Sequence, residues 1–237
     1  MKKALISGAT SGIGLALTEL MLQQNYRVVG CGRNEQALEQ IKVNFPDLFD
    51  YQTLDISETS TLNHNLNQAI AKMDGMDICV ISSGISERNP DLEWEIEQNI
   101  IKTNVSGFSQ AAIFAANYFR NQNRGHLVGI SSVAKYFGNP NPAYNASKAF
   151  EAIYLDGLRL RLERRGIHIT TVLPGFVETP MTKDQSRRFW SADAGIVAKQ
   201  MLKAIEKKRR YVFVTKRWRL FSWILPPLPF SLLRRIL

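Results

Sequence analysis

A tyrosine and a lysine stand four residues apart in the segment YNASK, at Tyr144 and Lys148. On a helix, positions i and i+4 lie on one face, so the phenol and the ammonium group would point the same way. A free phenol has a pKa of about 10, but a fixed positive charge beside it favours the phenolate and lowers that value. The spacing therefore suits a tyrosine that donates and accepts a proton, although such pairs also occur on helices that carry no chemistry.

The segment SGATSGIG follows directly after the first apolar run of the chain and contains three glycines, Gly8, Gly12 and Gly14. A strand, a glycine-rich turn and a helix start together form an anion site. Glycine lets the backbone approach a pyrophosphate, and the N–H groups of the helix N-terminus face it. The spacing is G-x-x-x-G-x-G rather than the commoner G-x-G-x-x-G. Its place at the first strand–helix junction still favours dinucleotide binding.

The residues that end the second apolar run indicate which dinucleotide binds. Enzymes that prefer NAD usually carry an acidic side chain there, which holds the ribose 2′-hydroxyl. Here the sequence is VVGCGRN, with Arg33 and no acid. Because a guanidinium can pair bidentately with a 2′-phosphate, we expect NADP(H) rather than NAD(H). The alternative is that this arginine simply extends into solvent from the end of the strand.

Length and composition favour one ordinary globular domain. The 237 residues are 45% hydrophobic and 22% charged, and they can bury a sizeable core. Cys31 and Cys79 both lie in apolar runs, so we expect buried, reduced thiols and a cytoplasmic protein. Near the N-terminus only three apolar residues are consecutive, which favours a strand over a secretory signal. From residue 203 onward there are ten Lys or Arg residues and one acid, so this segment carries the whole net charge of +9.

Short apolar runs alternate with segments of helical periodicity. Strands are expected at Ala4–Ser7, Arg27–Gly32, Asp50–Leu54, Asp77–Ser82, His126–Ser131, His168–Leu173 and Tyr211–Val214. Helices are expected at Gly12–Gln23, Glu35–Asn44, Thr59–Lys72, Gln98–Arg120, Tyr144–Arg165 and Ser191–Glu206. Near-continuous apolar strands that alternate with helices indicate parallel pairing with helices on both faces. The predicted fold class is α/β: one doubly wound Rossmann-type domain over residues 1–215 with a seven-stranded parallel sheet, then a basic, apolar extension over residues 216–237.

Three stretches together, TSGIG with its upstream glycine, YNASK and PGFVETPMT, resemble the short-chain dehydrogenases/reductases. The resemblance covers residues 1–215 and implies hydride transfer between NADP(H) and a carbonyl or alcohol. It implies that Tyr144 is the general acid or base. Lys148 would bind the nicotinamide ribose and make that phenol more acidic. Asn104, in IKTNVSG, matches the asparagine that links the lysine to solvent through a water.

The resemblance also implies a serine that hydrogen-bonds the substrate carbonyl. Ser132 begins the expected pattern of Ser132, Gly138 and Pro140, but it precedes Tyr144 by 12 residues where the family usually shows 13. Ser131 precedes Tyr144 by 13 residues. One deletion between Pro140 and Tyr144 explains the difference, so Ser132 is favoured and Ser131 stays open.

The same resemblance implies a set of cofactor-binding residues. They are Gly8, Thr10, Ser11, Gly12, Ile13, Gly14, Arg33, Asp55, Ile56, Ser83, Gly84, Tyr144, Lys148, Pro174, Gly175, Val177 and Thr179. Within this set Asp55 would contact the adenine, and the segment from Pro174 to Thr179 would position the nicotinamide. The family's N-N-A-G reads ISSG here, with Ser82 in place of an asparagine, which affects local stability rather than chemistry. No metal is expected, because the three histidines are scattered without ligand spacing.

We expect a reductase of a lipophilic ketone, aldehyde or acyl-type substrate. The segment 181–194 offers apolar contacts and a basic cluster, which suit an apolar ketone or an acyl substrate with an anionic end. These are Met181, Phe189 and Trp190, with Lys183, Arg187 and Arg188. A non-catalytic NADP-sensing protein is the alternative, disfavoured by the complete catalytic set. A sugar-nucleotide epimerase is disfavoured by the glycine spacing and the short length.

The C-terminal extension suits a membrane surface. Residues 220–233 carry no charge but are interrupted by Pro226, Pro227 and Pro229, so they are too short and broken to span a bilayer. Flanking arginines suit an interfacial segment on an anionic bilayer, and the uncharged centre argues against nucleic acid. The alternative is packing on a partner subunit or over the cleft. We expect a cytoplasmic protein, peripheral on the inner face of a membrane. The resemblance implies a homodimer or homotetramer through the helices that hold Asn104 and Tyr144.

Overall fold

One parallel sheet of seven strands organises the chain. The computed structural model describes residues 1–182 and 190–224. The strands follow the order β3-β2-β1-β4-β5-β6-β7. Their bounds are β1 Lys3–Ser7, β2 Arg27–Gly32, β3 Phe49–Thr53, β4 Ile78–Ile81, β5 Gly125–Ile130, β6 Ile167–Pro174 and β7 Tyr211–Val214. The predicted doubly wound α/β fold is confirmed, and the strand bounds differ from those expected by at most one residue at either end.

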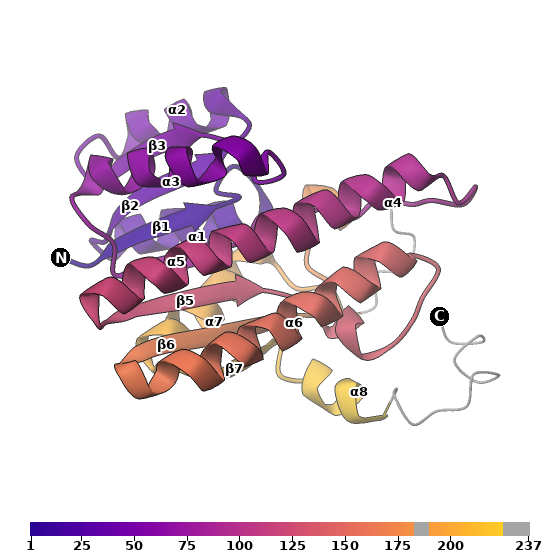
Figure 1. Cartoon of the computed structure of the whole chain (residues 1–237). Helices are drawn as coiled ribbons and strands as arrows, with labels where there is room; N and C mark the ends of the chain where they lie inside the picture. The colour runs from indigo at the N-terminus through magenta and orange to yellow at the C-terminus, as the bar shows by residue number, and fades with distance from the viewer. Residues whose placement is uncertain (183–189, 225–237) are drawn as a thin grey trace.

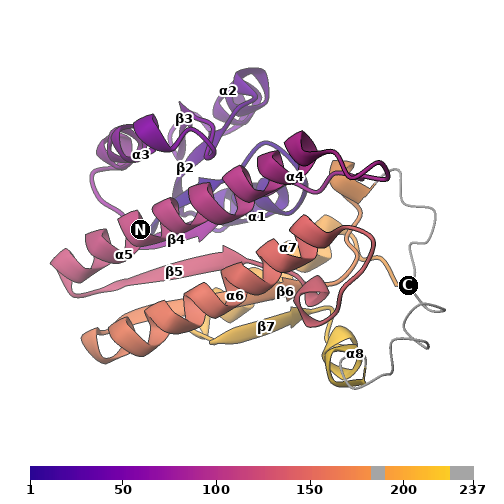
Figure 2. The same ribbon diagram turned by 45° about the vertical axis from the view of Figure 1, so that its right-hand side comes forward.

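Helices cover both faces of the sheet (Figures 1 and 2). Their bounds are α1 Gly12–Gln23, α2 Glu35–Asn44, α3 Thr59–Met73, α4 Trp94–Ile101, α5 Phe108–Gln122, α6 Pro142–Leu162, α7 Ala194–Glu206 and α8 Trp218–Ile224. Alternate strand residues face opposite layers, so Leu5 packs with α3, α5 and α6, whereas Ile6 packs with α1, α2 and α7. The two layers hold the sheet between separate apolar cores.

The helix expected at Gln98–Arg120 is one helical run that begins earlier and contains an irregular turn. Between α4 and α5, the segment Lys102–Gly107 is π-helical. Gly107, the last residue of this segment, packs against the loop that follows β3. A Cβ atom added to Gly107 would lie 2.2 Å from the Ile56 carbonyl oxygen. A period of 3.6 residues predicts the helix but not the extra residue in this turn, and such turns frequently occur at functional sites.

Capping residues shift two other predicted helix starts. The segment expected from Ser191 becomes helical at Ala194, because the Asp193 carboxylate accepts hydrogen bonds from the Gly195 and Ile196 N–H groups at 2.8 and 3.1 Å. The segment expected from Tyr144 begins at Pro142, a residue suited to a first turn.

Short helices complete the description. Three 3₁₀ segments lie at Val133–Tyr136, Glu163–Arg165 and Pro180–Thr182. Helix α8 was not predicted, and its Trp218 is buried against Val133 and Leu173. Among the helices of residues 1–182 and 190–224, none is both long and apolar enough to cross a membrane.

The strand register brings the predicted motifs together. Ser7 at the end of β1 pairs with Cys31 of β2 and Ile81 of β4, and Ile130 of β5 pairs with Val172 of β6. The loops that leave these strand ends carry the glycine turn, Arg33, the ISSG segment, the two serines and the PGFVETP segment. In open α/β sheets this edge is where ligands bind.

Candidate active site

A cleft of about 230 Å³ opens at the carboxyl ends of the strands. Most of the predicted residues line it: Gly8, Thr10, Ser11, Gly12, Ile13, Arg33, Asp55, Ile56, Ser83, Gly84, Ser132, Tyr144, Lys148, Pro174, Gly175, Val177 and Thr179. Gly14 and Asn104 support the cleft from behind. Residues that were not predicted also line it, and nearly all are chain neighbours of predicted ones: Gly32, Leu54, Ile85, Thr103, Ile130, Pro180 and Thr182.

The glycine turn presses helix α1 against the end of β1. Gly8 and Gly12 have φ values of +74° and +54°, which favour glycine. A Cβ on Gly14 would lie 2.0 Å from the Gly8 carbonyl oxygen. Ser11, the N-cap of α1, makes no side-chain cap, and the first turn has no acid. The N–H groups of that turn therefore remain available to an anion in the cleft.

Arg33 and Asp55 line the cleft beside the glycine turn, where Gly32 lies against Thr10. The Arg33 Nη1 atom is 3.5 Å from Asp55 Oδ2, and the arginine side chain is 71% exposed. Asp55 Oδ1 accepts hydrogen bonds from the Ser57 N–H and hydroxyl at 2.9 and 2.7 Å. Burial raises the pKa of Asp55, but these hydrogen bonds and the Arg33 charge outweigh it and hold its pKa below the ordinary value. An ionised Asp55 thus steadies a guanidinium that still faces solvent.

Tyr144 and Lys148 lie on the inner face of α6. The Lys148 Nζ atom is 5.8 Å from the centre of the Tyr144 ring. It donates to the Ile130 carbonyl oxygen at 3.1 Å and to both Glu151 carboxylate oxygens at 3.0 Å. Glu151 was not predicted, although it follows Tyr144 by seven residues and so continues the same helical stripe. A buried ion pair therefore stands behind the phenol.

Opposing effects set the charge states of this pair. Burial lowers the pKa of Lys148, but the charges of Glu151 and Tyr144 outweigh it, so its pKa is raised and it stays protonated. Burial raises the pKa of Glu151 to about 7, against the opposing pull of Lys148. The carboxyl group therefore changes charge close to neutral pH.

The two candidate serines differ in what their hydroxyls contact. Ser131 Oγ donates a 2.6 Å hydrogen bond to the Lys148 backbone carbonyl. Ser132 Oγ accepts from the Ala134 N–H at 3.1 Å, and its own proton points to the Pro174 carbonyl over a long 3.4 Å. The Ser131 proton is thus engaged in holding α6, while that of Ser132 can turn toward a ligand at little cost.

The Asn104 side chain is fully buried and ties three segments together. Its Oδ1 accepts from the Ile85 N–H, and its Nδ2 donates to the Ile85 carbonyl, each at 2.9 Å. Nδ2 also donates to Ser147 Oγ at 3.0 Å. A Cβ on Gly84 would lie 3.2 Å from Lys148 Nζ and 3.4 Å from Asn104 Oδ1. Asn104 therefore fixes the loop after β4 against α6. Because Gly84 has no side chain, this loop can lie close to both Lys148 and Asn104.

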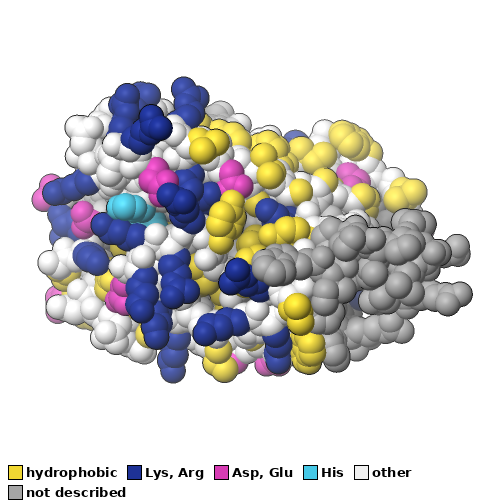
Figure 3. Space-filling model, turned by 90° about the horizontal axis from the view of Figure 1, so that it is seen from below, with side chains coloured by type: hydrophobic (Ala, Val, Ile, Leu, Met, Phe, Trp, Pro, Cys, Tyr) yellow, Lys and Arg dark blue, Asp and Glu magenta, His cyan; other side chains and the backbone are white. Residues whose placement is uncertain are grey.

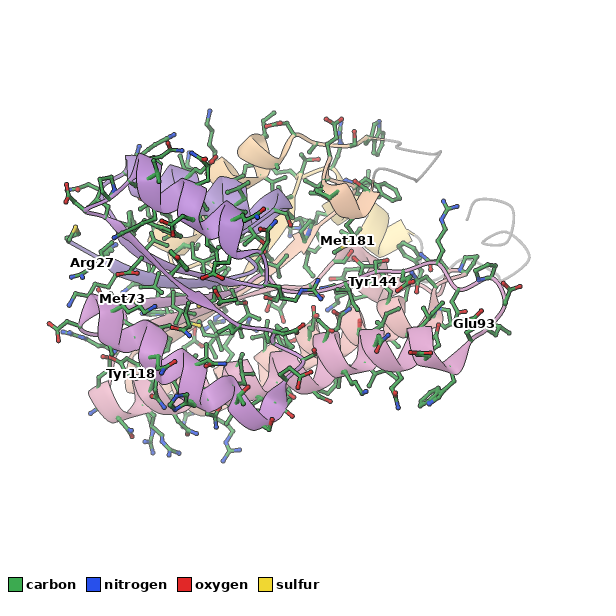
Figure 4. The ribbon with its side chains drawn as sticks, turned by 90° about the horizontal axis from the view of Figure 1, so that it is seen from above. Arg27, Met73, Glu93, Tyr118, Tyr144 and Met181 are labelled. Atoms are coloured by element: carbon green, nitrogen blue, oxygen red, sulfur yellow. The ribbon has the colours of Figure 1, made fainter. Side chains whose placement is uncertain are left out.

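Aromatic side chains pack against Gly175, a residue that lines the cleft. A Cβ on Gly175 would lie 1.9 Å from Trp218 Nε1. The Trp218 ring lies edge-on to Phe176 and Trp190, with centroids 5.6 and 6.2 Å away. Met181 also lines the cleft, and Figure 4 shows it near Tyr144. Trp218 has no sequence signal that marks it for the site, because its place follows from how α8 packs.

Some predicted substrate contacts lie outside the described residues: Lys183, Arg187, Arg188 and Phe189. In the part of the chain that the structure describes, no three His, Cys, Asp or Glu side chains gather as a metal site would require.

Known families and relatives match this chain over most of its length. Residues 2–189 match the family model described as short chain dehydrogenase. An uncharacterized oxidoreductase of Myxococcus xanthus is 30% identical over 187 residues, which are 76% of this chain and 74% of the relative. A 3-oxoacyl-(acyl-carrier-protein) reductase of Vibrio cholerae is 28% identical over 185 residues, 77% and 76% of the two chains.

Solved structures share the fold. A short-chain dehydrogenase from Sphingobium yanoikuyae in complex with NADPH has a TM-score of 0.83 at 19% identity, covering 98% of both chains. ElxO with NADP bound has a TM-score of 0.79 at 21% identity, covering 90% of this chain and 96% of that one.

Replacing Gly14 with alanine should weaken binding of the NAD(P) dinucleotide at least tenfold, or about 1.4 kcal/mol. The new methyl group would collide with the Gly8 carbonyl and displace the turn. Gly157→Ala is the matched control. That position is exposed within α6 with nothing within 4 Å, so alanine should stabilise the protein by about 0.5–1 kcal/mol and leave binding unchanged. Cofactor fluorescence titrations measure both. Wild-type affinity in Gly14→Ala would contradict this account of the turn.

Proposed function

This chain belongs to the short-chain dehydrogenase/reductase family of NAD(P)-binding oxidoreductases, and we propose that it is an NADPH-dependent carbonyl reductase. Its reaction would interconvert a carbonyl and an alcohol, chiefly by reducing a lipophilic ketone, aldehyde or acyl-type substrate. The observation that carries the proposal is the cleft itself, where the Tyr144 phenol, the buried Lys148 ammonium and the Ser132 hydroxyl stand at the end opposite Arg33.

The described side chains suit each step of a reduction. NADPH, when bound, supplies the hydride. Ser132 and Tyr144 would hydrogen-bond the carbonyl oxygen and stabilise the negative charge that develops on it. Tyr144 would then donate its proton, and Lys148 would hold the nicotinamide ribose. Asn104 would support proton resupply from solvent by keeping the loop after β4 in place.

The preference for NADP(H) rests on Arg33. Its guanidinium is exposed at the cleft, and Asp55 steadies it from one side, so a 2′-phosphate can approach the other. The fold neighbours solved with NADP or NADPH support the same cofactor.

Arg33→Ala should lower NADPH affinity at least tenfold while changing NADH affinity less than twofold, because only NADPH carries the 2′-phosphate that the guanidinium would bind. Parallel fluorescence titrations with the two cofactors measure this difference. Arg120→Ala, at an exposed position near the end of α5, is the control. An equal loss for both cofactors, or a wild-type preference for NADH, would show that Arg33 does not select the phosphate.

A lipophilic substrate is supported by apolar side chains in and beside the cleft. Met181 lines the cleft with a flexible apolar side chain, and Phe176 and Trp190 pack on Trp218, which lies against Gly175. The relative in Vibrio cholerae is a 3-oxoacyl-(acyl-carrier-protein) reductase, which supports the acyl-type substrates among these.

Tyr144→Phe should lower kcat for any substrate found by roughly 10²–10⁴-fold, because the ring is kept and only the proton donor is lost. NADPH oxidation with lipophilic ketones, aldehydes and 3-oxoacyl thioesters measures this, and NADPH binding by the variant should stay within about twofold of wild type. A wild-type protein that binds NADPH but turns over none of these would favour the alternative, an NADP-binding protein without catalysis. Undiminished turnover by the variant would overturn the role of Tyr144.

Peripheral contact with an anionic membrane is supported by a second groove. It measures about 850 Å³ and lies between α7 and β7. The charged residues that line it are all basic: Lys203, Lys207, Arg209, Lys216, Arg217 and Arg219. Figure 3 shows Lys and Arg side chains spread over the underside of the molecule. Such a face would attract anionic headgroups, at about 1 kcal/mol for each cation close to the surface.

The full-length protein should sediment with vesicles that contain phosphatidylserine but not with pure phosphatidylcholine vesicles. Lys203→Glu/Lys207→Glu should abolish most of this binding, whereas Arg120→Glu/Arg124→Glu, at the end of α5, should leave it nearly unchanged. Binding that is absent in the wild type, or equal in both variants, would argue against a membrane role for the groove.

A cytoplasmic location and a homodimer or homotetramer complete the proposal. Cys31 and Cys79 are free and buried, which supports a reducing compartment. Ile113 of α5 and Ile153 and Leu160 of α6 are exposed apolar side chains on the helices expected to join subunits, and sedimentation velocity would measure that association.

A further inference from the structure

Glu151 is an acid buried beside the lysine that we assign to the nicotinamide ribose. Its side chain is fully buried, and the Lys148 side chain is 7% exposed. Both carboxylate oxygens lie 3.0 Å from Lys148 Nζ, and Glu151 is about two turns of α6 after Tyr144. Among the described residues, Lys148 is the hydrogen-bond donor to this carboxylate, so the lysine orients it.

A buried ion pair is weak evidence for stability. Two charges removed from water recover little more than their desolvation cost, and apolar side chains of similar volume often stabilise a fold as well. The next buried positions of α6 toward its C-terminus, Ala152 and Leu155, are apolar, so a hydrophobic residue at position 151 would extend an apolar surface. What Glu151 adds is a negative charge next to Lys148, whose ammonium group lies 5.8 Å from the centre of the Tyr144 ring.

We infer that Glu151 is a positioning residue for the reaction: it holds Lys148 Nζ at the cleft and offsets part of the positive charge that Lys148 presents to the Tyr144 phenol. A protonated phenol is the form that reduction needs, because Tyr144 must donate a proton to the carbonyl oxygen. This inference rests on the proposed function and names a residue that favours the reductive direction within it.

The charges around the pair set the sign of the effect. Lys148 is the charged group that acts on Glu151, and Glu151 and Tyr144 are those that act on Lys148. The neighbouring strand and π-helix contribute neutral groups, namely the Ile130 carbonyl, the Ser131 hydroxyl and the Asn104 amide. Burial raises the pKa of Glu151 to about 7, so below that pH it is neutral and Lys148 acts with its full charge. Above it the carboxylate is charged and offsets part of the positive charge of Lys148 beside Tyr144.

The test is a comparison of wild type with Glu151→Gln, which keeps the shape and removes the charge. The alkaline limb of kcat/KM against pH should move to lower pH by about one unit, and the two profiles should converge in acid, where Glu151 is already neutral. The tyrosinate absorbance of the cofactor-free protein gives the same midpoint without any substrate. Subtracting the titration of the matching Tyr144→Phe protein isolates this residue.

Controls separate charge from packing. Glu151→Met, apolar and of similar length, should shift the midpoint as Glu151→Gln does and guards against misfolding of either variant. Glu151→Asp should stay near wild type. Glu163→Gln, which breaks an exposed ion pair with Arg210, should shift nothing. Unmoved tyrosinate midpoints in folded Glu151→Gln and Glu151→Met proteins would overturn the inference, even if their Tm fell. A shifted midpoint in a protein that reduces no carbonyl would uphold the coupling and reject only the proposed function.

Discussion

The site depends on keeping one positive charge buried at the carboxyl end of a parallel sheet. An ammonium group taken out of water needs oxygen atoms as partners. Lys148 Nζ donates to the Ile130 carbonyl at the end of β5 and pairs with Glu151 of its own helix. Those partners fix α6 against the sheet and so place Tyr144 over the cleft. Gly84 leaves the space beside the ammonium, and Asn104 clamps the loop in which Gly84 lies.

The nucleotide end is built by a different constraint, the close approach of backbone to backbone. Gly14 brings α1 within contact of the Gly8 carbonyl, which leaves the first N–H groups of α1 turned toward the cleft. The two ends work together because β1, β4 and β5 pair in register, so that the turn after β1 and the lysine behind β5 meet one edge. A dinucleotide is long enough to use both, with its phosphates at the glycine turn and its nicotinamide beside Tyr144.

The fold could be predicted from the sequence because local signals specify it, and most residues of the cleft were implied by the resemblance to the short-chain dehydrogenases/reductases. Apolar runs of strand length, helical periods and glycines in a turn report on their own surroundings. The π-helical turn at Asn104 could not be predicted, because a hydrophobic period of 3.6 residues gives no signal for one extra residue in a turn. Trp218 was missed because only the packing of α8 brings it to Gly175. Glu151 was missed although its spacing was visible, since whether a helical stripe is buried depends on its neighbours.

A crystal structure of the protein with NADP⁺ would show whether the buried lysine serves the cofactor. We expect Lys148 Nζ to lie within hydrogen-bond distance, about 2.7–3.2 Å, of the nicotinamide ribose hydroxyls while keeping its contact with Glu151. We also expect the 2′-phosphate against Arg33 and the pyrophosphate over the first turn of α1. A ribose held by other groups, with Lys148 bound only to Ile130 and Glu151, would contradict this role and make the buried lysine a structural residue.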